Sequence, residues 1–138
     1  MLNRVTLMGR LTHDPELRQT QGSDPKAVVR FGLAVDRDYK NKDGNKITDF
    51  FDVVAWRKKA EFISKYFKKG QLVYIEGRLQ RDVWEDENNQ KKTAYKIIAE
   101  NCYFADSKKV SGEQNINQTD HADETTQKSN NYFDDLPF

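Results

Sequence analysis

Hydrophobic and polar residues alternate with a period of two through much of the first 106 residues. In residues 5–11, Val5, Leu7 and Leu11 fall on one side, and polar or basic residues fill most of the other. Similar alternation recurs in residues 27–35, 47–56, 71–84 and 92–104. Because successive side chains of a strand point to opposite faces, the pattern predicts five β-strands that share a core.

The period changes over residues 58–67, where Ala60, Ile63 and Phe67 recur at helical spacing. Two lysines and then Gly70 follow, which is typical of a helix C-terminus. The predicted order is three strands, one helix and two strands. This order indicates an all-β fold with one helix: a five-stranded OB-fold barrel with the helix between strands three and four.

Turn-forming residues separate the predicted strands. Asp43 and Gly44 mark the tip of a long polar hairpin between the second and third strands, and residues 86–89 form a turn before the fifth. Gly77, inside the fourth strand, predicts a bend there.

The amino-acid composition of the chain changes after residue 106. Residues 107–131 are rich in Asn, Gln, Thr and acids, so they bury too little apolar surface to offset their ordering entropy. We therefore expect residues 1–106 to form the folded domain and residues 107–131 to form a disordered linker. Residues 132–138 differ again, because they combine three aromatics and a leucine with two acids.

Charge is divided unevenly between the two parts of the chain. The overall net charge is +1, but residues 1–109 carry 22 Lys and Arg against 16 Asp and Glu, or +6. Residues 110–138 carry one Lys against six acids, or −5. A basic body with an acidic end favours a domain that binds a polyanion. With a lone Cys102, no secretory signal and no apolar run long enough to span a membrane, we expect a cytoplasmic protein without membrane contact.

The third predicted strand carries the strongest indication of function. With Phe51, Val53 and Ala55 toward the core, Phe50 and Trp56 fall on the outer face, together with Asp52 and Val54. Outer strand faces are usually polar. Trp84 lies at the end of the fourth strand and Tyr39 on the polar hairpin. Exposed aromatics among cations suit single-stranded nucleic acid. The candidate phosphate contacts are Arg4, Arg10, Arg30, Arg37, Lys58 and Lys69.

Other interpretations remain open on the residues alone. An outer aromatic such as Trp56 can equally pack against a subunit or a second core layer. A magnesium-dependent nuclease could use the plentiful carboxylates, although no spacing marks a catalytic site. One histidine in the body and one cysteine cannot form a zinc site. An RNA-binding or adaptor protein of the same fold is a further alternative, because stacking does not sense the ribose hydroxyl.

Several segments resemble the bacterial single-stranded DNA-binding proteins. They are residues 3–11 (NRVTLMGRL), 14–18 (DPELR), 31–35 (FGLAV), 49–56 (DFFDVVAW), 69–70 with 74–79, and the terminal 134–138 (DDLPF). The resemblance implies a homotetramer of OB-folds around which single-stranded DNA winds during replication, repair and recombination, with no cofactor, metal or catalytic residue. It maps the family's stacking aromatics onto Tyr39, Phe50, Trp56 and Trp84. It maps the family's cations onto Arg4, Lys58 and Lys69, and subunit contacts onto Tyr74 and Glu76.

Two acids depart from the family pattern. Family members often carry basic residues just before the aromatic of strand four, where this chain has Asp82 and Val83. Asp82 should share a face with Trp84, and Asp52 lies between two of the predicted stacking aromatics. We therefore expect weaker or differently routed DNA binding.

The C-terminal tip predicts a second activity. A partner with an apolar pocket rimmed by Arg or Lys could capture the final ring and its carboxylate, while the proline stiffens the approach. The resemblance implies replication, repair and recombination enzymes as these partners. The predicted contact residues are Asp134, Asp135, Leu136, Pro137 and Phe138.

Overall fold

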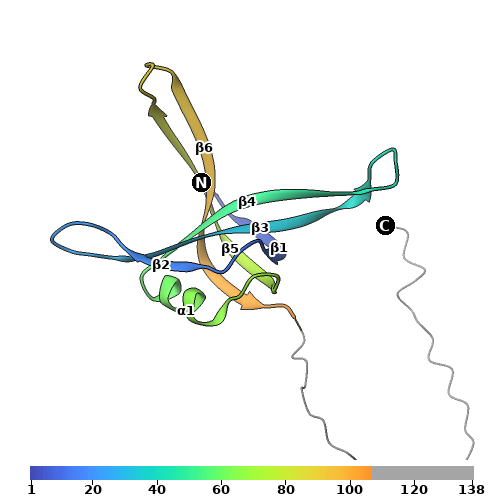
Figure 1. Ribbon diagram of the computed structural model, residues 1–138, viewed down its shortest axis with the longest axis horizontal. Helices are drawn as coiled ribbons and strands as arrows, with labels where there is room; N and C mark the ends of the chain where they lie inside the picture. The colour runs from blue at the N-terminus through green and yellow to red at the C-terminus, as the bar shows by residue number, and fades with distance from the viewer. Residues whose placement is uncertain (107–138) are drawn as a thin grey trace, which may run out of the picture. The chain divides into compact units, whose positions relative to one another are not determined.

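The structure is a computed structural model that describes residues 1–106, and it contains six strands and one helix in this part (Figure 1). In chain order they are β1 (Val5–Leu11), β2 (Glu16–Gln19), β3 (Ala27–Lys40), β4 (Lys46–Trp56), α1 (Lys58–Tyr66), β5 (Leu72–Glu85) and β6 (Lys91–Phe104). The predicted linker and tip lie outside the described residues.

Five of the strands close into a barrel. The sheet order is β1-β5-β6-β4-β3-β2, and β1 also pairs with β3, which closes the ring. The β4–β6 pairing is parallel, whereas the other pairings are antiparallel. The predicted five-stranded OB-fold barrel, with its helix between the third and fourth barrel strands, is confirmed.

One strand was not predicted. β2 pairs with β3 outside the ring, and all four of its side chains are exposed. A strand with no residue in the core leaves no alternation of apolar and polar positions. Its signal is therefore absent from the hydropathy pattern.

The core follows the predicted inward faces. Val29, Leu33, Val53 and Ile75 are fully buried inside the barrel, and Ile63 projects into the same cluster from α1. The helix thus closes one end of the barrel, as its apolar spacing requires. Among residues 1–106, no helix has the length and apolar character needed to cross a membrane.

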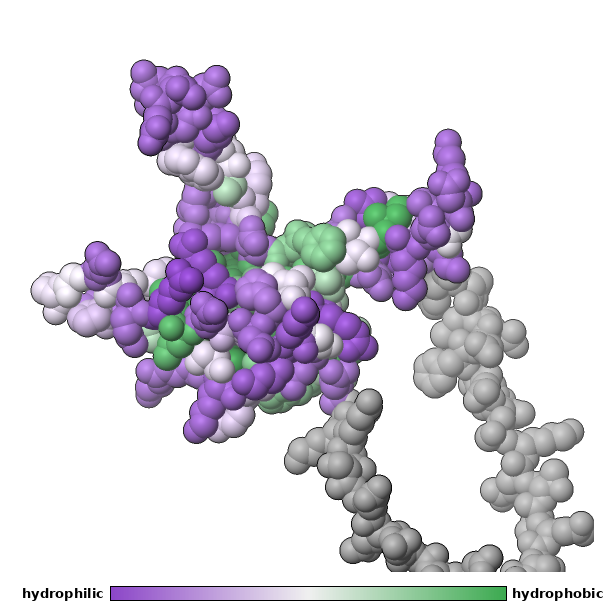
Figure 2. All heavy atoms as spheres, in the orientation of Figure 1, coloured by the Kyte–Doolittle hydropathy of each residue, from purple (hydrophilic) through white to green (hydrophobic). Residues whose placement is uncertain are grey.

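The β3–β4 and β5–β6 hairpins extend beyond the barrel as arms (Figure 1). The β3–β4 arm turns around Gly44, whose φ of 80° favours glycine. This agrees with the predicted tip, although β3 continues to Lys40 rather than ending at residue 35. The β5–β6 arm carries hydrophilic residues at its outer end (Figure 2). Its pairing shifts register between Glu76 and Gly77, where a bend was predicted.

Candidate nucleic-acid interface

The candidate interface is the outer face of β3, β4, β5 and β6. Directly opposed residues on neighbouring strands share a face, so the β3–β4 register defines its rows. Val28 pairs with Trp56, Gly32 with Asp52, and Ala34 with Phe50. Phe50 and Trp56 are six residues apart on one strand face, which separates them by about 20 Å.

The four predicted stacking aromatics all expose part of their rings to solvent. The exposed fraction is 72% for Phe50, 59% for Tyr39, 48% for Trp84 and 38% for Trp56. These exposed fractions are too large for rings buried in a second core layer of the same chain. Flat rings on a water-facing strand surface provide platforms on which bases can stack.

Val54 differs from its predicted place. It was expected on the exposed outer face, but only 3% of its surface is accessible. It lies between Arg30 of β3 and Ile98 of β6, which pair with it on either side. Because strands flank it on both sides, it forms part of the floor of the interface rather than an exposed contact.

A groove crosses this face from β3 to the β5–β6 arm. It brings together Arg30, Trp84 and both acids that depart from the family pattern. Sequence reasoning did not single out several of its residues as site residues, among them His13, Tyr95 and Lys96, because only the folded chain brings them beside Trp84. The groove is lined by His13, Arg30, Phe31, Gly32, Asp52, Val53, Val54, Asp82, Trp84, Ala94, Tyr95 and Lys96.

A chain of polar contacts runs along the β5 side of the groove. Arg78 Nη2 donates to Gln80 Oε1 at 3.0 Å, and Gln80 Nε2 donates to Asp82 Oδ1 at 2.9 Å. Lys96 Nζ lies 2.6 Å from Asp82 Oδ2. The hydrogen bond from Gln80, followed by that from Lys96, lowers the pKa of Asp82, so its carboxylate is charged at neutral pH.

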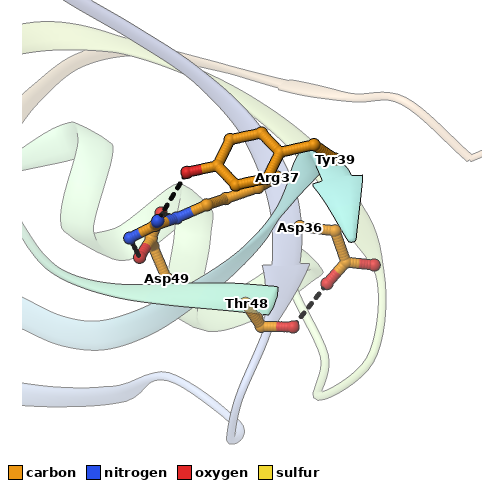
Figure 3. A network of polar contacts seen from close by, with 5 residues as sticks. All are labelled: Asp36, Arg37, Tyr39, Thr48 and Asp49. Atoms are coloured by element: carbon orange, nitrogen blue, oxygen red, sulfur yellow. Dashed lines mark hydrogen bonds and ion pairs between the residues drawn. The ribbon is translucent and has the colours of Figure 1, made fainter. Parts of the chain in front are cut away.

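The β3–β4 arm positions Tyr39 through a second network (Figure 3). Arg37 Nη1 donates to the Tyr39 hydroxyl at 2.7 Å, while the same guanidinium pairs with Asp49. The bond to Asp49, followed by that to Tyr39, raises the pKa of Arg37, and the bond from Arg37 lowers the pKa of Asp49. Beside them, Thr48 Oγ1 donates to Asp36 Oδ1 at 2.6 Å. The arm therefore holds its aromatic by side-chain contacts as well as by the backbone ladder.

The six predicted phosphate contacts fall into two groups. Arg4 pairs with Glu76 at 3.7 Å, Arg10 with Asp106 at 3.6 Å, and Arg37 with Asp49 at 2.8 Å. The other three make no ion pair with any residue in 1–106; they are Arg30, Lys58 and Lys69. Of these three, Arg30 lines the groove and the two lysines do not.

The predicted subunit residues lie on another face, formed by β1, β5 and β6. Tyr74 donates its hydroxyl proton to Glu76 Oε1 at 2.8 Å, and Asn101 Nδ2 donates to Glu76 Oε2 at 3.3 Å. These bonds lower the pKa of Glu76. Arg4 joins this cluster, so the structure brings it together with the subunit residues and not with the groove.

No metal centre is formed by the described part of the chain. Within residues 1–106, no three His, Cys, Asp or Glu side chains gather closely enough to hold an ion.

Comparison with known proteins places the chain in a family. The model of the single-strand binding protein family matches residues 2–105. "Single-stranded DNA-binding protein 1" of Lactococcus lactis subsp. lactis is 43% identical over 114 residues, covering 83% of this chain and 75% of the relative. "Single-stranded DNA-binding protein 3" of Streptococcus agalactiae is 37% identical, with 100% of both chains covered. The resemblance noted in the sequence is thus confirmed, and the chain belongs to the single-strand binding protein family.

Proposed function

We propose that the chain binds single-stranded DNA without regard to base sequence. The observation that carries this proposal is the exposure of Phe50, Trp56 and Trp84 on one outer face of the barrel. Every base offers a flat π-face, so rings on such a surface stack any of them, at about 1–3 kcal/mol per base. Tyr39 extends the row of platforms onto the β3–β4 arm.

Cations complete the surface by contacting phosphates. Arg30 in the groove, with Lys58 and Lys69, is available without breaking an ion pair inside the described domain. Arg4, Arg10 and Arg37 would have to exchange a carboxylate partner for a phosphate. Each phosphate contact releases condensed counterions, so binding should weaken steeply as salt is added.

Titration with poly-dT at several salt concentrations, followed by tryptophan fluorescence, tests this function. We expect strong quenching in the full chain, and variants Trp56→Phe and Trp84→Phe report which indole is quenched. Tyr66→Ala is the control, because Tyr66 is an exposed aromatic on α1 and not on the outer face of β3, β4, β5 and β6. Unaltered emission from both indoles at low salt would reject base stacking on this face.

The family consists of binding proteins, and this chain is not an enzyme. The choice of DNA over RNA needs its own measurement, because stacking platforms do not sense the ribose hydroxyl. Competition between oligo-dT and oligo-U of equal length decides it. We expect DNA to displace RNA, and equal affinity would favour a general single-strand binder.

We also propose that the chain acts in the cytoplasm, at the nucleoid, during replication, repair and recombination, as a homotetramer. Tyr74 and Glu76 lie on a β1–β5–β6 face outside the groove, which leaves the groove free in an assembly joined through them. Light scattering should give four chains for the wild type. Replacing Tyr74 by a charged residue should lower the mass while the monomer keeps its circular dichroism spectrum.

Partner recruitment through the C-terminus completes the proposal. We assign DNA binding to residues 1–106, a linker to 107–131 and a partner-binding tip to 132–138. The tip combines an acidic pair, Asp134 and Asp135, with Leu136, Pro137 and the terminal Phe138. Deleting Phe138 should abolish co-purification of replication and repair enzymes but leave poly-dT binding intact. Loss of poly-dT binding as well would contradict the assignment of DNA binding to residues 1–106, and co-purification that survives the deletion would contradict the role of the tip.

A further inference from the structure

The ion pair between Asp82 and Lys96 lies inside the candidate DNA groove. Lys96 Nζ is 2.6 Å from Asp82 Oδ2, and their side chains are 22% and 37% exposed. Both residues line the groove together with Trp84, which follows Asp82 by two residues on β5. A strand period of two sets Asp82 and Trp84 on the same face. A lysine beside a stacking ring is thus held by a carboxylate of its own chain.

The carboxylate is fixed in place by its neighbours. Gln80 donates to the Asp82 oxygen that does not face Lys96, and Arg78 in turn donates to Gln80. Asp82 is therefore oriented toward the lysine before any ligand arrives. An anionic oxygen at hydrogen-bond distance from an ammonium group is the contact that a DNA phosphate would otherwise make.

We propose that Asp82 acts as an internal competitor of the DNA phosphate by occupying Lys96 in the free protein. In the wild type Lys96 stays paired with Asp82 and contacts no phosphate, so the pair weakens DNA binding and lowers its salt dependence. This inference rests on the proposed function and assigns a tuning role to one residue of that surface. The simpler alternative is a cross-strand salt bridge that only holds the β5–β6 arm together.

Asp52 provides a matched control. It lines the same groove and carries the same charge, but it forms no ion pair with any residue in 1–106. Replacing either acid by its amide removes one negative charge from the path of the DNA. Only Asp82→Asn also frees a lysine. Comparing the two variants therefore separates the loss of repulsion between a carboxylate and the phosphates from the release of Lys96.

The experiment measures the slope of log K against log salt for oligo-dT, using the full chain. One additional phosphate contact steepens the slope for single strands by about 0.7. Asp82→Asn should show this increase, and its advantage over wild type should shrink roughly threefold between 50 and 200 mM salt. Asp52→Asn should bind more tightly with the slope of the wild type.

Removing the lysine identifies the cation. Lys96→Gln should leave the slope unchanged in the wild-type and Asp52→Asn backgrounds, because Lys96 is not a phosphate contact there. In the Asp82→Asn background, Lys96→Gln should return the salt slope to the wild-type value. Equal slopes for the two amide variants would overturn the proposal, and so would an increase that survives in Asp82→Asn/Lys96→Gln. A wild type that does not bind oligo-dT would instead refute the proposed function, and circular dichroism checks that each variant is folded.

Discussion

Arg37 holds Asp49 through two parallel hydrogen bonds, from Nε to Oδ2 at 2.8 Å and from Nη2 to Oδ1 at 2.9 Å. Fork-to-fork pairs of this kind fix orientation as well as distance. The remaining Nη1 donates to the Tyr39 hydroxyl, and the guanidinium carbon lies 5.7 Å from the centre of that ring (Figure 3). A residue predicted to contact phosphate therefore orients a predicted stacking ring in the free protein.

Asp49→Asn removes the charge and one acceptor of the fork, so Arg37 and Tyr39 should lose their fixed orientation. Asp49→Asn also frees Arg37 to contact a phosphate, but the loss of an oriented ring should outweigh that gain. Affinity for oligo-dT should therefore fall, by less than in Tyr39→Ala, where loss of a stacked base corresponds to about 1–3 kcal/mol. Fluorescence anisotropy of a labelled oligo-dT measures both.

A double variant separates positioning from general charge effects. Removing a negative charge from a DNA-binding surface should by itself strengthen binding, so weakening is the diagnostic sign. In the Tyr39→Ala background, Asp49→Asn should no longer weaken binding, because no ring remains to be positioned. If it weakens binding equally in both backgrounds, Asp49 does not act through Tyr39.

How far the sequence predicts this molecule depends on the kind of signal. The alternation of apolar and polar residues predicted which side chains point into the barrel, because each barrel strand has one face in the core. It missed β2, whose side chains are all exposed, and it placed Val54 on the open face because it does not report what neighbouring strands cover.

The limits of prediction are clearest for charged residues. Arg4 and Arg37 look like free cations in the sequence, because their partners Glu76 and Asp49 lie on other strands. Only the strand register brings these pairs together. The same holds for Lys96, whose partner Asp82 belongs to the opposite strand of the β5–β6 arm. Residue type therefore predicted which groups could bind DNA but not which are already paired.

A second prediction follows from carboxylates that accept hydrogen bonds. The bond from Thr48, followed by that from Lys46, lowers the pKa of Asp36 in the folded protein. A pKa lower than in the unfolded chain adds stability at higher pH, and this stability is lost as pH falls through the folded value. Unfolding by urea should therefore show declining stability below about pH 4, the range of unperturbed aspartate.

Asp36→Asn tests this assignment directly. The variant should lose stability at pH 7 and differ less from the wild type at pH 3, where protonation of the aspartate has begun to remove the same interaction. The reverse trend, a difference that grows on acidification, would contradict a lowered pKa for Asp36 in the folded state. Because Asp36 lies on the β3–β4 arm, oligo-dT binding reports separately on whether the arm is disturbed.

A third prediction concerns Cys102 on β6. Burial against the core raises the pKa of its thiol to about 11, and the charge of Lys59 only partly offsets this effect. The thiolate is the reactive form, so Cys102 should react slowly with iodoacetamide at pH 8. Mass spectrometry should detect rapid labelling once urea unfolds the chain. Equally fast labelling of the native protein would mean that the thiol is open to solvent and ionised.

The final prediction concerns Gly77, at the register shift between β5 and β6. A Cβ placed on this glycine would collide with the carbonyl oxygen of Ile98 and approach Ala99 Cα to 3.2 Å. These are backbone atoms of the neighbouring barrel strand, which cannot move aside as the end of a side chain can. Gly77→Ala should therefore force β5 and β6 apart and destabilise the fold by about 1–3 kcal/mol.

Gly44→Ala is the control for Gly77→Ala. It lies at the tip of the β3–β4 arm with a φ of 80° and no atom within 4 Å of an added Cβ. It should lose only the conformational preference of glycine for a positive φ, about 1–2 kcal/mol. Enlarging the side chain distinguishes the two sites further, because Gly77→Val should unfold at much lower urea than Gly77→Ala, as expected of a steric clash. If valine and alanine were equivalent at position 77, close approach of the strands would not be the reason for glycine there.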